Sequence, residues 1–284
     1  MFAFKYSSRA FLCVAVLISV TCQAARVQAA GPGEGASTPD PFGNQPYAEA
    51  QVIEPNPDFI TIYSGYEFVK DSNFYYGGFI GALNGDLSRS GFLVQGFGGF
   101  GNYEYPNSAV PGGTVDGDIT QLSGLVGYQV FAGTARFRLF GGADWQNNDL
   151  SPSDPTNAVS GSDTNFIATG SVTTVGPGRL YFDLLGSYAV TNQTYWSRAR
   201  LGYRFGRVVM GPEGAFYGNE NFNSQRAGGF VKVPLGPNFD VTVAGGFNFV
   251  ANDEFFEEFG SGSFGGLGGI SDGGYGNISI STWF

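Results

Sequence analysis

Apolar and polar residues alternate along most of the chain after Phe59, in short segments that turn residues separate. Between 120 and 130, every second residue is Thr, Leu, Gly, Val or Tyr. The segments 180–190, 195–205 and 239–249 show the same period of two. This period places alternate side chains on opposite faces of a strand. The pattern therefore predicts β-strands with one apolar face and one face that carries polar residues.

Twelve strand-like segments of about 10 to 14 residues follow one another, and a count of ten or fourteen strands also fits. Strands of this length suit a tilted crossing of a membrane. The twelve predicted ranges are 58–70, 72–84, 90–103, 117–131, 134–145, 163–175, 179–191, 194–206, 207–219, 223–234, 239–250 and 274–284.

The lengths of the connections alternate along this series. Long connections at 104–116, 146–162 and 251–273 each follow an odd-numbered strand. Tight turns follow even-numbered strands and lie at 131–134, 176–178, Gly206 and 235–238. Outer-membrane barrels have short turns at one rim and long loops at the other. We therefore predict an all-β fold, an antiparallel transmembrane β-barrel over 58–284, in the outer membrane of a Gram-negative bacterium.

The N-terminal 57 residues lack this pattern. Residues 1–30 carry Lys5 and Arg9 before an apolar run and small residues, which predicts a cleaved signal peptide. An uncleaved anchor, or a lipoprotein attached at Cys22, fits these residues less well. Residues 31–57 are rich in Gly and Pro and predict a flexible periplasmic segment.

At the other end of the chain, Ile278, Ile280, Thr282 and Phe284 share one strand face. This ending resembles the signal that the outer-membrane assembly machinery reads in a last strand, so we expect that machinery as a partner.

Composition fits a barrel and excludes several functions. Only 13% of the residues are charged, while the chain has 28 Phe, 15 Tyr and 46 Gly. Mean hydropathy is −0.04, far below that of a helical membrane protein. The net charge of −10 becomes −13 after removal of 1–30, and no basic stretch is present, so nucleic acid is not an expected partner. Outer-membrane lipid is an expected partner.

The chain has no histidine, and its two cysteines, Cys13 and Cys22, lie in the predicted signal peptide. Catalytic sites that need His or Cys cannot form in the mature protein. We predict no catalytic residues, no cofactor and no metal ligands. Two acid-rich stretches, 144–163 with Asp144, Asp149, Asp154 and Asp163, and 253–258, predict solvated loops rather than a cation site.

The most distinctive polar residues lie on the predicted inner faces of adjacent strands. A tight turn at Gly206 places Arg200 nearly opposite Glu213. Arginine on a lipid-facing surface costs about 2–4 kcal/mol at the midplane, so these residues are expected to face inward. The candidate lumen-lining contacts for a solute are Trp196, Arg198, Arg200, Arg204, Glu213, Tyr217 and Arg226. They form either a salt-bridged plug or a ladder that guides an anionic or hydroxylated solute.

Several blocks resemble the cellulose biosynthesis protein BcsS family, from about Ile60 to the C-terminus. The longest block is Tyr195 to Gly206 (YWSRARLGYRFG). Shorter blocks are Ala82 to Leu87, Asp149 to Pro155, Gly211 to Glu213 with Gly218 to Glu220, and Val233 to Pro237. The resemblance implies an accessory protein of bacterial cellulose synthesis in the outer membrane, with the glucan or other synthesis components as candidate partners.

Three functional hypotheses follow. The first is a non-enzymatic barrel that supports export or surface organisation of cellulose. The second is a small porin or solute channel unrelated to cellulose. The third is a hydrolase that uses carboxylates alone, with Glu213 as its test residue; the absence of the usual catalytic residue types disfavours it.

Overall fold

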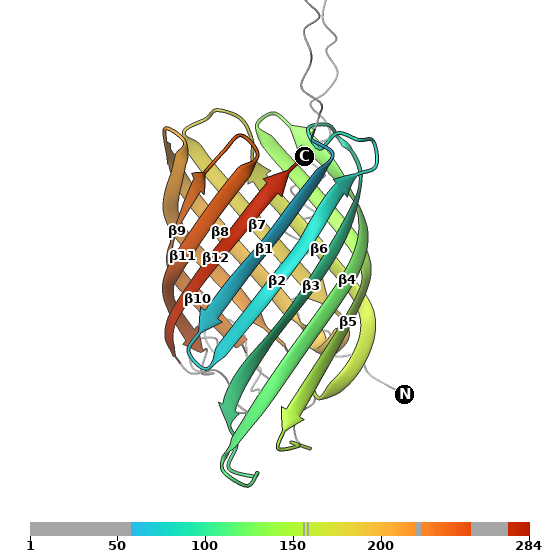
Figure 1. The fold of residues 1–284 in the computed structure, drawn as a ribbon, viewed down its shortest axis with the longest axis vertical. Coiled ribbons are helices and arrows are strands. Elements are labelled where there is room, and N and C mark those ends of the chain that lie inside the picture. The colour runs from blue at the N-terminus through green and yellow to red at the C-terminus, as the bar shows by residue number, and fades with distance from the viewer. Residues whose placement is uncertain (1–57, 156, 158, 220–222, 251–271) are drawn as a thin grey trace, which may run out of the picture.

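The computed structural model describes residues 58–155, 157, 159–219, 223–250 and 272–284. Its strands form one closed antiparallel barrel in which each strand pairs with the next and β1 pairs with β12 (Figure 1). The bounds are β1 Ile60–Val69, β2 Ser72–Ala82, β3 Gly91–Pro106, β4 Thr114–Ala132, β5 Ala135–Ser151, β6 Gly161–Thr174, β7 Leu180–Ala189, β8 Tyr195–Phe205, β9 Val208–Gly218, β10 Asn223–Pro234, β11 Phe239–Val250 and β12 Gly273–Trp283. The predicted twelve-stranded barrel is confirmed.

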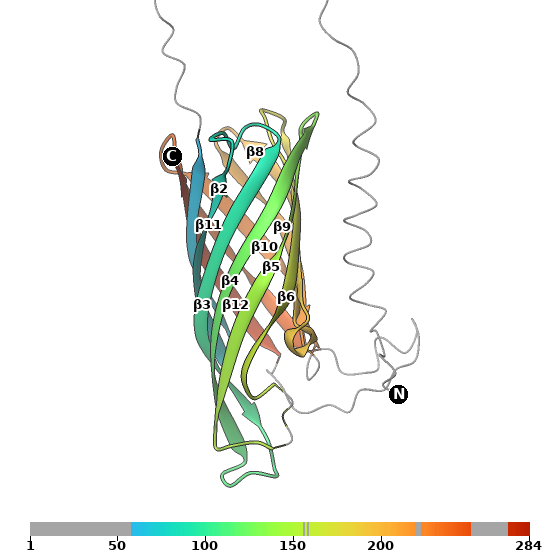
Figure 2. The same cartoon turned by 90° about the vertical axis from the view of Figure 1, so that its right-hand side faces the viewer.

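The barrel closes where its first and last strands meet. The register pairs Thr61 with Trp283, and the Phe284 amide donates to the Ile60 carbonyl at 3.0 Å. This rim, called the terminus end below, also carries the tight turns that follow even-numbered strands. The opposite rim, the far end, carries the connections 107–113 and 152–160 (Figures 1 and 2). The predicted alternation of short and long connections holds only in part, because the loop 83–90 follows the even-numbered β2 at the terminus end and is longer than 107–113.

Three strands are longer than predicted. β3, β4 and β5 have 16, 19 and 17 residues, and their hairpins project beyond the other strands at the far end (Figure 2). The prediction that 104–116 and 146–162 are loops is therefore wrong at both ends of each range, and only 107–113 and 152–160 lie outside strands. The added residues, such as Glu104 and Asp116, are polar but still pair in register. Backbone pairing continues there without the apolar alternation on which the prediction relied.

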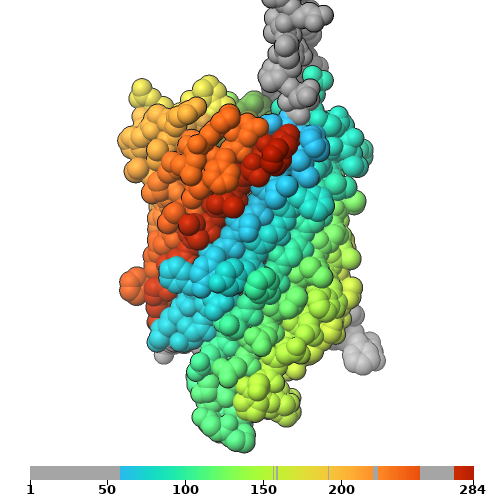
Figure 3. All heavy atoms as spheres, in the orientation of Figure 1, coloured from blue at the N-terminus to red at the C-terminus, as the bar shows by residue number. Residues whose placement is uncertain are grey.

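The two faces of the wall differ as the alternation predicts. Outward residues are apolar and exposed, including Val126 at 67% and Leu180 at 69%. Inward residues are polar yet buried, including Asp144 and Asn248 at 0%. Figure 3 shows the outer surface of β12, β1 and β2 as a continuous wall of side chains. The interior of the barrel therefore combines buried polar residues with apolar clusters, one of which contains Leu93, Leu125 and Phe140.

Some predictions concern residues that the structure does not describe. The signal peptide 1–30, the segment 31–57 and the acid-rich stretch 253–258 lie outside the described residues. Within the described part of the chain, no helix has the length and apolar character needed to span a bilayer.

Candidate functional site

A buried ion pair joins β8 to β9 inside the barrel. Arg200 and Glu213 are register partners, and the Arg200 guanidinium donates through Nε to Glu213 Oε2. The two residues are 5% and 7% exposed. The Tyr275 hydroxyl, which reaches over from β12, donates to Glu213 Oε1 at 3.1 Å. Both carboxylate oxygens of Glu213 therefore accept a hydrogen bond. The register also confirms the predicted proximity of Arg200 and Glu213.

Tyr275 can reach Glu213 because of one glycine. A Cβ atom at Gly228 would lie 2.5 Å from the Tyr275 hydroxyl oxygen and 2.3 Å from the Gly245 carbonyl oxygen. Real Cβ atoms do not approach other atoms so closely, so a side chain at 228 would displace the phenol. Several of the many glycines face aromatic rings in this way on the inner surface, including Gly65 beneath Tyr76.

Three further ion pairs connect inward side chains, two of them between consecutive strands and one between strands distant in sequence. Arg198 Nη2 lies 3.2 Å from Asp183 Oδ2, between β8 and β7. Arg226 on β10 reaches Glu67 on β1 at 2.7 Å, across β11 and β12. Lys232 Nζ contacts Asp240 Oδ2 at 2.6 Å. These pairs connect five strands from inside, and they leave Arg198, Arg226 and Glu67 at the surface of a cavity.

That cavity has a volume of about 660 Å³ and runs along the barrel interior. Six of the seven predicted solute contacts line it, namely Trp196, Arg198, Arg200, Glu213, Tyr217 and Arg226. The seventh, Arg204, is not among the lining residues. Its guanidinium donates to the Gly176 carbonyl at the terminus end and lies 5.8 Å from the ring of Tyr181.

An aromatic wall faces these residues from β1 to β3, and the sequence interpretation missed it. Its members line the same cavity and are Tyr63, Phe74, Tyr76, Phe97, Tyr103 and Tyr105. Neighbouring rings stack at centroid distances of 6.2–6.5 Å. Arg136 and Arg138 on β5 and Glu67 on β1 were also missed. The alternation Arg136-Phe137-Arg138 was the signal for two inward charges.

The loop 83–90 closes part of the terminus end. Leu87 is 6% exposed and belongs to a cluster with Leu93, Leu125, Phe140, Ile167 and Ala189 on the inner wall. The fully buried Gln129 amide donates to the Leu87 carbonyl at 3.0 Å and the Arg89 carbonyl at 2.6 Å. Asp86 accepts hydrogen bonds from the Ser88 hydroxyl and amide, which lower its pKa, and pairs with Arg89. The loop is therefore fastened to β4.

Loss of the two Gln129 hydrogen bonds should expose the loop 83–90 to protease. In a Gln129→Ala variant, two hydrogen bonds of about 1 kcal/mol each disappear, so trypsin should cut after Arg89 about thirtyfold faster. Limited proteolysis of the folded barrel, read by mass spectrometry, measures this rate. Gln95→Ala is the control, because Gln95 bonds only the Tyr63 hydroxyl in the described residues. Equal rates in the two variants would contradict the assignment.

The acidic residues at 144–163 do not form the solvated loop that was predicted. Asp144 lies on β5, points inward and is 0% exposed. It accepts hydrogen bonds from Gln121 at 2.8 Å, from Gln146 at 2.6 Å and from Ser123. Asp154 is held by Tyr105 and Asn107. The described residues contain no group of three acidic, His or Cys side chains that could hold a metal ion.

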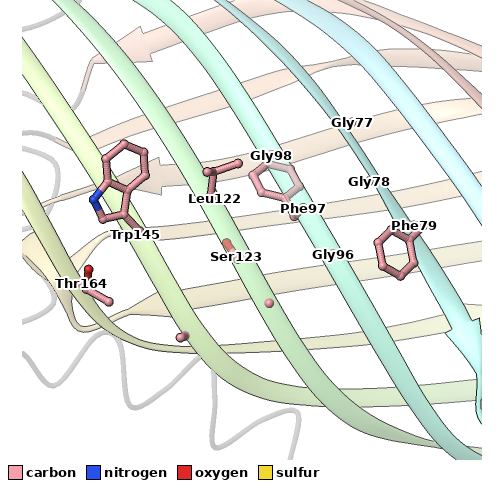
Figure 4. A pocket seen from close by; sticks show the side chains of 12 residues that line it. Gly77, Gly78, Phe79, Gly96, Phe97, Gly98, Leu122, Ser123, Trp145 and Thr164 are labelled. Carbon is pink, nitrogen blue, oxygen red and sulfur yellow. The ribbon is translucent and has the colours of Figure 1, made fainter.

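A second hollow lies on the outer surface of β2 to β6 and has a volume of about 490 Å³ (Figure 4). Its lining combines glycines with Phe79, Leu122, Trp145 and Thr164 and includes no charged side chain. Outward glycines such as Gly96 and Gly124 leave the wall thin there.

Comparison with known proteins identifies one family. Residues 61–284 match the family model described as cellulose biosynthesis protein BcsS. No curated protein sequence matches the chain. Among solved structures, KdgM porin is 9% identical with a TM-score of 0.41, covering 79% of this chain and 99% of that one.

Two further solved structures come from Escherichia coli. The transport unit of the autotransporter AIDA-I is 10% identical with a TM-score of 0.45, covering 84% of this chain and 94% of that one. Outer membrane phospholipase A is 9% identical with a TM-score of 0.38, covering 80% and 92%.

Proposed function

Because the chain belongs to the cellulose biosynthesis protein BcsS family, we propose that it is a non-enzymatic outer-membrane barrel that supports export or surface organisation of the glucan. The observation that carries this proposal is the family match, which spans the barrel from residue 61 to residue 284. The family supports a role in cellulose biosynthesis, and the closed barrel fits an outer-membrane protein.

The outer surface supports the membrane location. Large apolar side chains such as Phe92, Val126 and Phe247 are at least 60% exposed there. A soluble protein rarely exposes an apolar surface that runs around the whole molecule. In the outer membrane, lipid chains would cover this surface and fill the hollow between Phe79 and Trp145.

The interior supports contact with a saccharide. Flat aromatic rings on β1 to β3 face guanidinium groups and hydroxyls on β7 to β10 across one cavity. Aromatic faces pack against sugar rings, and Arg donors bond hydroxyl and carboxylate oxygens. The cavity volume of about 660 Å³ is that of a binding site rather than a wide aqueous pore. We infer that the lumen holds a short stretch of glycan.

A hydrolytic role has less support. Glu213 was the test residue for that hypothesis, and its two oxygens are occupied by Arg200 and Tyr275. A general acid or nucleophile must instead reach a substrate atom. This arrangement gives Glu213 a structural role between β8, β9 and β12.

A solute channel unrelated to cellulose is the second candidate, and the lumen cavity is the observation that favours it. Purified protein in planar bilayers would then show steady conductance that cellulose fragments leave unchanged. Silent bilayers would remove this candidate.

Deletion of the gene tests the cellulose role. We expect the deletion strain to form less cellulose, or a pellicle of altered architecture, and the wild-type gene to restore both. Cellulose is measured as glucose released by acid hydrolysis of the washed, alkali-resistant fraction. Unchanged yield and architecture in the deletion strain would overturn the proposal.

A matched pair of tryptophans tests the lumen. Trp196 lines the cavity, whereas Trp145 lies at the outer hollow. We expect Trp196→Ala to restore the deletion strain poorly and Trp145→Ala to restore it fully, at equal levels of folded protein. Equal restoration by both variants would contradict a lumen contact with the glycan.

A further inference from the structure

Two arginines on β5 line the cavity without a carboxylate partner. Arg136 and Arg138 point to the same inner face of the strand. Among the described residues, neither forms an ion pair within 4.0 Å. Arg138 is 8% exposed, its Nε donates to Gln129 Oε1 at 3.1 Å, and its Nη2 is buried without a hydrogen-bond partner. A buried guanidinium whose only bond goes to a neutral amide is unusual, because buried charges are normally paired.

The facing strands supply no spare acidic group. On β7, Asp183 already accepts bonds from Arg198 at 3.2 Å and from Thr173 at 2.9 Å. On β9, Glu213 is occupied by Arg200 and Tyr275. The acid on β5 that is nearer to the two arginines, Asp144, lies six residues from Arg138, about 20 Å along the strand.

This part of the interior therefore carries excess positive charge within a chain whose net charge is −10. Four arginines, Arg136, Arg138, Arg198 and Arg200, line the cavity here against two carboxylates, Asp183 and Glu213. The excess is local, and no general basic character of the protein accounts for it.

The space between the arginines is open. In the register, Arg138 lies beside Ser171 on β6, and Arg198 occupies the same row two strands further on, on β8. Arg136 lies beside Thr173 on β6, and Arg200 occupies that row on β8. On the strands in between, Ser171 and Thr173 of β6 have short side chains and line the same cavity, and so do Leu185 and Asp183 of β7. The Asp183 carboxylate is turned to Arg198 and Thr173, from which it accepts hydrogen bonds. The result is a polar recess between Arg136 and Arg138 on one side and Arg198 and Arg200 on the other.

We propose that Arg136 and Arg138 form an oxyanion site, which binds a carboxylate or phosphate group of a ligand in the lumen. Each guanidinium offers parallel N–H donors that match the spacing of two oxyanion oxygens. The Ser171 hydroxyl on the floor of the recess adds a donor. The site deepens the proposed function, because it assigns an acidic substituent to the glycan or solute that the lumen holds.

Calorimetric titration of the mature chain, folded in detergent micelles, tests the site. Sodium phosphate and sodium glucuronate are the probes, with ionic strength held constant by sodium chloride, and cellobiose is the neutral comparison. We expect at least one of the two anions to bind. Addition of cellobiose should leave the affinity of the protein for that anion unchanged. Phosphate binding alone identifies a phosphate group as the ligand, and glucuronate binding alone identifies a carboxylate.

Variants assign the binding to the two arginines. We expect Arg136→Gln/Arg138→Gln to weaken anion binding by more than about a hundredfold, since two charge-assisted bonds are lost. Arg207→Gln is the matched control, because Arg207 is exposed in the turn between β8 and β9. If the double variant does not fold, Arg138→Lys is the alternative, because lysine keeps the charge but lacks the parallel N–H donors of a guanidinium. It should weaken anion binding by a smaller factor than the double variant.

Failure of wild-type protein to bind either anion, or equal affinity in wild type, Arg138→Lys and the double variant, would overturn the site. These results are independent of cellulose yield. A deletion strain with normal cellulose would overturn the proposed function and leave the site intact, whereas absent binding would leave the cellulose role untouched.

Discussion

Replacement of Glu213 by leucine is expected to destabilise the folded barrel by about 3–5 kcal/mol, because the buried Arg200 would lose its counter-charge. Arg200 is 5% exposed, its Nη2 already lacks a hydrogen-bond partner, and the carboxylate of its register partner Asp183 is already bound to Arg198. The Tyr275 hydroxyl would lose its acceptor as well. Urea unfolding of the protein in lipid vesicles, followed by tryptophan fluorescence, measures the free energy of unfolding.

A double variant separates the loss of charge balance from the loss of packing. In Arg200→Met/Glu213→Leu both charges are absent, and apolar replacements of a buried pair are often neutral. Most of the stability should therefore return. Tyr275→Phe removes a single bond to a carboxylate and should cost less, about 1.5–3 kcal/mol. A double variant as unstable as Glu213→Leu would show that shape, rather than charge pairing, determines stability there.

The pairing of Arg200 with Glu213 was predictable because it depends on local features. The turn at Gly206, whose φ is 63°, sets the register of β8 on β9. Alternation then decides which side chains point inward. The same reasoning placed Arg198 and Trp196 in the interior, where the structure shows them at the cavity.

Contacts across the barrel were beyond such reasoning. Arg226 meets Glu67 over a separation of 159 residues, through two intervening strands. Which side chains meet inside depends on closure and strand stagger, and no local signal encodes either. Leu87 posed a different problem, because an apolar residue in a loop of turn-forming residues gives no sign that the loop folds inward.

The far-end extensions show the limit of hydrophobic alternation as a strand signal. Alternation reports a face in contact with an apolar environment, and β3 to β5 continue for several residues after it stops. Pairs such as Glu104 with Asp116 keep the backbone ladder while both side chains are polar. The end of the alternation therefore marks the end of the apolar surface rather than the end of the strand.

A charge on the outer surface tests whether hydrocarbon surrounds this wall. Val243 lies at the middle of β11, is 51% exposed and pairs with Val231 and Ile278. In lipid vesicles, Val243→Arg should destabilise the barrel by about 2–4 kcal/mol, the effect of arginine at the midplane. The same urea unfolding experiment measures it. Leu235 is the matched control, because it is 65% exposed in the terminus-end turn 235–238.

Arginine at 235 would lie near the interface, where the expected effect falls to about 0–1 kcal/mol. The difference between the two variants therefore reports depth in the bilayer, since both replace an exposed apolar residue by the same charge. If both effects were small and equal, and the wild-type barrel stayed folded in buffer without detergent, water rather than lipid would surround the wall. The apolar outer surface would then need a protein partner to cover it.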